Sequence, residues 1–293
     1  MTHNPQPILL PSGAKLDFSG PALVMAVVNC TGDSFYAPSR ALLDEAVDRA
    51  LAAEAEGAAI IDFGGESTRP GSQYVSAEDE LARLIPVITA FRKRSALAVS
   101  VDTRKAAVAQ AVLDAGADII NDISALEDDP LLAELCASRR AAVVLMHKKG
   151  VPLTMQQDPC YEDVTAEVAA YLAEAAQRAE AAGIEPDKII VDPGIGFGKR
   201  HEDNIELIRQ MERFTRLAEN RRKHYPVLVG LSRKGFIGEI TGRRIEERLA
   251  GTIAANAAAI TGGAAIIRVH DVKEHIDLVK MLFALRLPQT GGQ

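Results

Sequence analysis

The feature that most constrains the fold of this chain is a unit that recurs along it: a short apolar run, a few polar residues and a stretch with helical spacing. Eight runs fit this description, at residues 23–28, 59–61, 98–101, 119–120, 142–146, 189–191, 227–230 and 265–269. They are apolar throughout, which is typical of strands buried on both faces of a parallel sheet. Because strands and helices alternate, the pattern predicts the α/β class.

The stretches between the runs have the spacing of amphipathic helices. Glycine, a common stop signal for helices, follows three of them at Gly57, Gly116 and Gly183. The predicted helices cover residues 41–56, 76–94, 105–115, 163–182, 201–220, 244–260 and 272–285.

Eight strand units in about 250 residues match the number and size of a (β/α)8 TIM barrel. We therefore expect a single barrel domain across residues 1–293, with a core at about 21–286. A doubly wound open sheet is the alternative, although no Gly-x-Gly-x-x-Gly follows the first run. Residues 8–18 surround Pro11-Ser12-Gly13 and predict an N-terminal β-hairpin that caps the barrel floor.

Composition excludes several classes of protein and partner. Forty acidic residues outnumber 33 Lys and Arg, so no basic excess is present to bind nucleic acid. The weakly charged stretch at residues 251–267 contains glycines and Asn256 and predicts a helix and a strand, not a membrane span. Three cysteines without a CxxC pair favour a reducing cytoplasm, and residues 1–21 lack the pattern of a signal peptide.

Polar residues end every predicted strand. In a TIM barrel these positions surround the active site. Asp62, Asp102, Asn121 and Asp192 form a set of carboxylates and an amide that suits a ligand rich in N–H donors, such as an aminopyrimidine ring. No pair of histidines accompanies them, so zinc is disfavoured. Helix capping or ion pairing is the alternative role for Asp102 and Asp192.

The cations form a second expected set. Arg69 lies in a loop rich in glycine and hydroxyl groups at residues 64–71, and Lys234 follows the seventh run. Arg268 and His270 share one face of the last strand, where they suit an anionic leaving group. The alternative for each is a surface ion pair.

Aromatic residues make up only 4% of the chain. Two phenylalanines, Phe35 and Phe197, lie in loops at the expected barrel mouth, where they are able to close over a flat ligand. The alternative is simple packing within each loop.

Seven blocks of this sequence, in order, resemble the dihydropteroate synthases. They lie at residues 28–35, 62–71, 100–103, 120–122, 192–199, 232–234 and 268–271. Gly-Gly-Glu-Ser-Thr-Arg-Pro-Gly at 64–71 and Arg-Val-His-Asp at 268–271 are the most specific blocks. The similarity runs from about residue 24 to residue 272.

The resemblance implies a TIM barrel that joins p-aminobenzoate to 6-hydroxymethyl-7,8-dihydropterin pyrophosphate in folate biosynthesis, giving 7,8-dihydropteroate and pyrophosphate. It implies pterin contacts for Asp102, Asn121, Asp192 and Lys234, with Asp62 and Thr68 near the pterin substituent and the pyrophosphate. It implies pyrophosphate contacts for Asn29, Arg69, Arg268 and His270, with Asn29 also binding Mg²⁺. It implies a p-aminobenzoate pocket, where sulfonamides compete, formed by Phe35, Arg69, Pro70, Phe197 and Ser232.

The same resemblance implies catalytic roles for Asp102, Lys234, Arg268 and His270. An anionic Asp102 would stabilise the cation that develops on the pterin. Mg²⁺, Arg268 and His270 would stabilise the leaving pyrophosphate. A cytoplasmic homodimer is also expected, with small molecules as substrates and no nucleic-acid or membrane partner.

The sequence departs from the family pattern at several positions, and two other functions stay open. Cys30 and Gly32 stand where Val and Pro are usual, and Gly235 stands where Ser is usual. A methyltetrahydrofolate:corrinoid methyltransferase would share the aspartates and Asn121 but would not need the cationic residues. A non-catalytic pterin-binding relative is the other alternative.

Overall fold

The computed structural model describes residues 5–30, 40–67, 72, 74–150, 155, 159–217 and 224–285. Eight parallel strands form one sheet in the order β8-β7-β6-β5-β4-β3-β10-β9. The strands are β3 (Leu23–Asn29), β4 (Ile60–Gly64), β5 (Ala98–Asp102), β6 (Ile119–Asp122), β7 (Ala142–Met146), β8 (Ile189–Asp192), β9 (Leu228–Val229) and β10 (Ile266–Val269). A bridge between Val191 and Val227 joins the two ends of this sheet. The predicted α/β barrel is confirmed.

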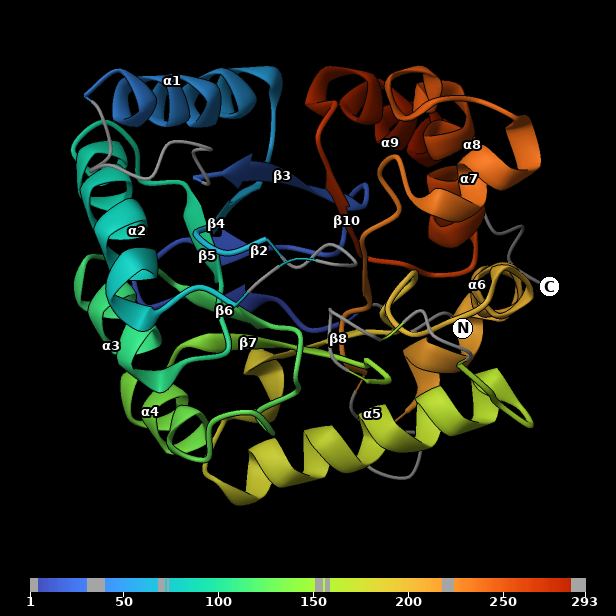
Figure 1. The fold of residues 1–293 in the computed structure, drawn as a ribbon, viewed down its shortest axis with the longest axis horizontal. Coiled ribbons are helices and arrows are strands. Elements are labelled where there is room, and N and C mark those ends of the chain that lie inside the picture. Colours follow the sequence, from blue (N-terminus) through green and yellow to red (C-terminus); the bar gives the residue numbers. More distant parts are fainter. Residues whose placement is uncertain are drawn as a thin grey trace, which may run out of the picture.

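Helices surround the barrel on its outside (Figure 1). They are α1 (Arg40–Glu56), α2 (Ala77–Arg92), α3 (Ala106–Asp114), α4 (Leu131–Arg139), α5 (Val164–Ala181), α6 (His201–Arg209), α7 (Gly235–Thr241), α8 (Leu249–Thr261) and α9 (Val272–Ala284). Side-chain caps fix two of the starts: Ser76 Oγ accepts from the Asp79 amide at 3.1 Å, and Asp163 Oδ1 from the Ala166 amide at 3.0 Å. Within the described residues no helix has the length and apolarity needed to cross a membrane.

The structure corrects two helix predictions and adds two helices that were not predicted. The helix expected at 201–220 ends at Arg209, and a 3₁₀ segment follows at Met211–Arg216. Met211 and Phe214 are both fully buried three residues apart, which matches the three-residue turn of a 3₁₀ helix. The helix expected at 244–260 is likewise a short 3₁₀ turn, Ile245–Glu247, followed by α8. The sequence prediction missed α4 and α7, each of which buries only two of its side chains and so shows little apolar periodicity.

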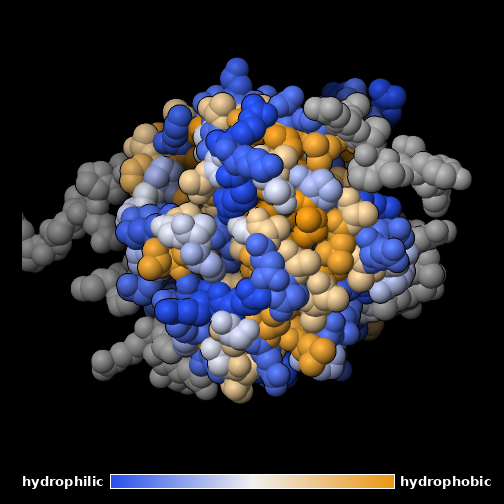
Figure 2. All heavy atoms as spheres, turned by 90° about the vertical axis from the view of Figure 1, so that its left-hand side faces the viewer, coloured by the Kyte–Doolittle hydropathy of each residue, from blue (hydrophilic) through white to orange (hydrophobic). Residues whose placement is uncertain are grey.

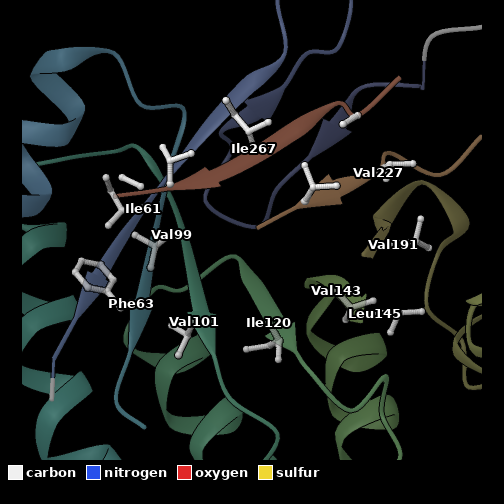
Figure 3. Close-up of a cluster of buried hydrophobic side chains, with 14 of the residues drawn as sticks. Ile61, Phe63, Val99, Val101, Ile120, Val143, Leu145, Val191, Val227 and Ile267 are labelled. Atoms are coloured by element: carbon white, nitrogen blue, oxygen red, sulfur yellow. The ribbon is translucent and has the colours of Figure 1, made fainter. Parts of the chain in front are cut away.

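Two apolar clusters fill the inside and the outside of the barrel wall. Outward-facing residues such as Phe63, Val101 and Ile120 pack under the helices, as the close-up in Figure 3 shows. Inward-facing residues form the second cluster: Met25, Ile60, Ala98, Ile119, Ala142, Val144, Ile190, Leu228 and Ile266. The exterior over α2 and α3 carries hydrophilic side chains with apolar ones between them (Figure 2).

A β-hairpin closes the barrel floor, as predicted. β1 (Ile8–Leu9) pairs antiparallel with β2 (Lys15–Leu16). Ile8, Leu10 and Phe18 pack into the inner cluster from below. Apolar side chains of the hairpin therefore fill the floor, and the polar cavity described below lies at the carboxyl ends of the strands.

Asp118 ties this floor to the barrel. Its buried carboxylate accepts from the Ser12 amide at 2.9 Å, the Val99 amide at 3.0 Å and Arg92 Nη2 at 2.5 Å. One side chain thus connects the hairpin, β5 and α2. Its removal would leave two amides without these acceptors. The Arg92 guanidinium would keep the carbonyls of Gly116 and Leu97 but would lose its carboxylate.

We expect Asp118→Ala to lower the free energy of unfolding by about 3–5 kcal/mol, the range for breaking one side of a buried ion pair. Denaturant unfolding measures this loss. Asp114→Ala is the matched control, because Asp114 pairs with Arg139 at the exposed surface and its loss should leave the midpoint nearly unchanged. Equal midpoints for the two variants would contradict the role of Asp118.

Candidate active site

The period of two along the strands determines which polar side chains reach the barrel mouth. Asp62 lies two residues after the interior residue Ile60, and Arg268 lies two residues after Ile266. The same relation holds for Asn121 after Ile119 and for Asp192 after Ile190, and Asp102 lies four residues after Ala98. Each polar group therefore lies on the interior face of its own strand, above an apolar residue of the inner cluster, with Ser100 between Ala98 and Asp102.

These side chains meet at a cavity of about 970 Å³ at the carboxyl ends of the strands. Its lining includes these predicted site residues: Asn29, Asp102, Asn121, Asp192, Phe197, Ser232, Lys234, Arg268 and His270. Asp62 is fully buried and contacts Asn121 and Arg268 of the lining. Four predicted residues, Phe35, Thr68, Arg69 and Pro70, lie outside the described residues.

Arg268 is the centre of the charged layer. Its Nε donates to Asp62 Oδ2 at 2.6 Å, and its Nη2 donates to Asp102 Oδ2 at 3.3 Å. Asn121 Nδ2 donates to the same Asp62 oxygen at 3.2 Å. The sequence predicted separate sets of carboxylates and cations, and that expectation is wrong for Arg268. Only the closed barrel places the end of β10 within reach of β4 and β5.

One acceptor in this layer is left open. Asp62 Oδ1 is buried and has no hydrogen-bond partner among the described residues. A buried acceptor without a partner is costly, and a ligand N–H would satisfy it. Burial and the neighbouring carboxylate of Asp62 raise the pKa of Asp102 to about 7, although Arg268 opposes the shift.

Asp192 occupies the other side of the cavity, at the end of β8. Its Oδ1 accepts from the Gly194 amide at 2.7 Å, and its main chain pairs with Met146 of β7. Burial raises the pKa of Asp192 to about 6, while the Gly194 amide and Lys234 act in the opposite direction.

Lys234 and Phe197 form one wall of the cavity. Lys234 Nζ donates to the Ile195 carbonyl at 2.8 Å and lies 4.2 Å from the centre of the Phe197 ring. Burial lowers the pKa of Lys234 to about 8, while Asp192 favours its charged form. An ammonium over an aromatic face gains electrostatic attraction, so the pair holds the aromatic wall in place.

His270 and Ser232 lie together at the rim. The His270 amide and its Nδ1 are 3.3 Å and 2.9 Å from Ser232 Oγ. Below them, Arg233 and Asp271 make a bidentate ion pair of 3.1 Å and 2.6 Å that joins the loops after β9 and β10. The sequence motifs contained both residues, but we assigned no role to either.

A second ion-pair group supports the loop after β4. Lys105 Nζ lies 2.5 Å from Glu66 and 2.6 Å from Glu80, and Arg104 joins Glu66 to Asp128 at 3.2 Å and 3.0 Å. Glu66 lines the cavity just before Thr68–Pro70. Sequence reasoning missed this group, although the position of Glu66 within the 64–71 motif was an available signal.

Asn29 offers a side-chain oxygen that fits a magnesium ligand at the barrel mouth. It is the exposed last residue of β3 and lines the cavity. The described residues contain no group of three His, Cys, Asp or Glu side chains able to hold a metal. Mg²⁺ often takes one or two protein oxygens together with water and substrate phosphates. A single amide oxygen therefore fits a magnesium ion that is also bound by the phosphates of a substrate. It does not fit an ion that is held by protein side chains alone.

Comparisons with known proteins agree with this geometry. The family of pterin binding enzymes matches residues 25–270. The dihydropteroate synthase of Escherichia coli (strain K12) is 44% identical over 278 residues, which covers 94% of this chain and 95% of the relative. The dihydropteroate synthase of Synechocystis sp. is 42% identical and covers 94% of each chain.

Solved structures give the same result. The Yersinia pestis dihydropteroate synthase, in a sulfonamide drug complex, has a TM-score of 0.87 at 38% identity and covers 96% of this chain and 99% of its own. The Xanthomonas albilineans dihydropteroate synthase with 4-aminobenzoic acid has a TM-score of 0.87 at 41% identity and covers 98% and 100%. The chain belongs to the dihydropteroate synthase family of transferases.

Proposed function

We propose that the barrel mouth joins p-aminobenzoate to 6-hydroxymethyl-7,8-dihydropterin pyrophosphate, with the residue roles given below. The observation that carries this proposal is the buried layer of Asp62, Asp102, Asn121 and Asp192 directly beside Arg268 and Lys234. It offers acceptors for a ring rich in N–H groups and cations for an anionic leaving group. A relative from X. albilineans has been solved with 7,8-dihydropteroate, the product of this condensation.

The pterin ring is proposed to lie on the buried carboxylates. Asp192 of β8 and Asn121 of β6 both line the cavity and accept N–H groups from the aminopyrimidine edge. The open Oδ1 of Asp62 is a further acceptor. Lys234, which reaches the loop after β8, donates to an acceptor of the ring.

The reaction exchanges one bond for another at the pterin methylene. Its C–O bond breaks and the electron pair leaves with pyrophosphate, while the amine nitrogen of p-aminobenzoate forms a C–N bond and releases a proton. An ionised Asp102 stabilises the positive charge that develops on the pterin. Arg268 and His270 bind the departing phosphate oxygens. When bound through Asn29, Mg²⁺ neutralises charge on the pyrophosphate.

The p-aminobenzoate is proposed to bind against Phe197, near Lys234 and Ser232. The ring of Phe197 is half-buried beside the cavity, so it is available for contact with a second aromatic ring. Phe35, Thr68, Arg69 and Pro70 complete the mouth in this proposal, which for them rests on the sequence motifs alone.

We also propose a cytoplasmic homodimer made of one domain per chain. Cys30, Cys136 and Cys160 are free thiols, which suits a reducing compartment. Large apolar side chains are exposed on the late helices, among them Ile240 on α7 and Met281 on α9. Burial of such side chains against a second copy would stabilise a dimer.

The direct test is turnover with both substrates and Mg²⁺. We expect pyrophosphate and 7,8-dihydropteroate to appear in equal amounts, and no dihydropteroate to form without p-aminobenzoate. Calorimetric binding of the pterin pyrophosphate without any turnover would instead identify a non-catalytic pterin-binding relative and would refute the proposal.

Lys234→Ala and Arg268→Ala should each lower kcat/KM more than tenfold. Each removes a charge-assisted contact that contributes about 1.5–3 kcal/mol. Steady-state kinetics measures the loss, with Lys280→Ala on the exposed face of α9 as a control. Arg268→Ala should also lower the melting temperature, because it leaves Asp62 and Asp102 without their cation. Kinetics within twofold of the unchanged protein for both variants would contradict these roles.

Asp102 gives a prediction for pH. Its pKa is raised to about 7 in the folded protein, so the native state holds this proton more tightly than the unfolded state. Stability from this group is therefore present at low pH and is lost as pH rises from about 4 to 7. We expect Asp102→Asn to raise the melting temperature by a few degrees at pH 8, and by less at pH 5.

The same variant should be nearly inactive at pH 8, because a neutral amide cannot stabilise the cation. In the unchanged protein, kcat/KM should fall as pH is lowered through 7. Asp44→Asn on the exposed surface of α1 serves as the control for the thermal measurement. A melting difference for Asp102→Asn that is equal at pH 5 and pH 8 would refute the assignment.

A further inference from the structure

Lys199 is a buried lysine at the end of the loop that follows β8, and the reaction as proposed above does not use it. Its side chain is 2% exposed. Nζ donates to the carbonyls of Gly194 at 2.9 Å, Phe197 at 3.1 Å and His147 at 3.4 Å. It also lies 2.9 Å from His147 Nδ1. One ammonium group therefore joins the loops after β7 and β8.

This arrangement is costly to maintain. Among the described residues, no carboxylate lies within ion-pair distance of Lys199 Nζ. Burial lowers the pKa of Lys199 to about 7; Asp192 and Asp203 favour the charged form, and Lys234 and Lys149 oppose it. Burial also lowers the pKa of His147, to about 3, so its ring is neutral and Nδ1 is free to accept from the ammonium. An apolar side chain would fill this space without the cost of burying a charge. Packing alone therefore does not explain a lysine here.

The two loops that Lys199 joins are in very close contact. Gly194 has φ +66°, and a Cβ there would lie 1.8 Å from the His147 carbonyl oxygen. Gly198 has φ +60°, and a Cβ there would lie 2.1 Å from the Lys149 carbonyl oxygen. The glycines let residues 194–198 pack directly against residues 147–149. The hydrogen bonds of Lys199 Nζ hold these two segments together.

The position of Phe197 depends on the hydrogen bonds of Lys199 more than the position of Asp192 does. The Asp192 backbone is held by its strand pairing with Met146, and its carbonyl accepts from the His147 amide at 3.0 Å. The Phe197 carbonyl instead accepts from Lys199, while the Phe197 ring lies beside Lys234 in the cavity wall. Loss of the ammonium should therefore move the aromatic wall and leave the carboxylate at the end of β8 in place.

We propose that Lys199 is a positioning residue for the arylamine substrate: it fixes residues 194–198 against residues 147–149 and so holds the Phe197 ring against p-aminobenzoate. The inference rests on the proposed function, since it assigns the Phe197 wall to that substrate. Lys199 itself does not touch either substrate in this proposal.

The test compares Lys199→Met with Lys188→Met. Lys188 is a matched control: it is also buried, it lies at the opposite end of β8, and its Nζ donates to the Leu9 carbonyl at the barrel floor. Steady-state kinetics, calorimetric binding of the pterin pyrophosphate with Mg²⁺, and melting temperature are measured for both variants and the unchanged protein.

For Lys199→Met we expect KM for p-aminobenzoate to rise at least tenfold, kcat to change less than threefold and Kd for the pterin pyrophosphate to change less than threefold. Lys188→Met should lower the melting temperature without altering these constants. If Lys199→Met does not fold, Lys199→Gln, which is one bond shorter and has two donors, should show the same separation with a smaller rise in KM.

Two results overturn the inference while the proposed function stands. One is an unchanged KM for p-aminobenzoate in whichever Lys199 variant folds. The other is a parallel loss of pterin and p-aminobenzoate binding that follows the melting temperature. An unchanged protein that makes no dihydropteroate overturns the proposed function and, with it, this inference.

Discussion

The alternation of side chains along the strands of a closed barrel is the constraint on which this structure depends. Every second residue of a strand faces the interior. Ile60 and Asp62 therefore share one face of β4, and Ile266 and Arg268 share one face of β10. Apolar residues and the hairpin fill the lower interior, and a layer of charged side chains lies above them at the mouth.

That charged layer must neutralise itself because it has little access to water. Arg268, at 23% side-chain exposure, serves both Asp62 and Asp102. The neutralisation is incomplete: the pKa values of Asp102 and Asp192 stay raised, and Asp62 keeps an open acceptor. Such a layer destabilises the free protein and is satisfied by a ligand that brings N–H donors and anionic oxygens, which is the usual compromise between stability and function.

Buried lysines hold the loops above this layer in two different ways. Lys105 lies between the carboxylates of Glu66 and Glu80, so charge attraction fixes the start of the loop after β4. Lys199 is surrounded by carbonyl oxygens and an imidazole, so hydrogen-bond geometry fixes the loop after β8. The first loop adjoins the expected pyrophosphate side of the cavity, and the second carries the aromatic wall.

The strands, the hairpin and the polar strand ends were predictable from the sequence alone, because apolar runs and the polar residues that follow them are local properties. It also determined the family through ordered motifs, while Phe35, Thr68, Arg69 and Pro70 stay predictions. Three features are visible only in the folded barrel: Arg268 pairs with aspartates 206 and 166 residues away, Met211 and Phe214 lie in a 3₁₀ segment, and Lys199 joins two loops. These outcomes depend on which strands become neighbours when the barrel closes, and no local pattern contains that information.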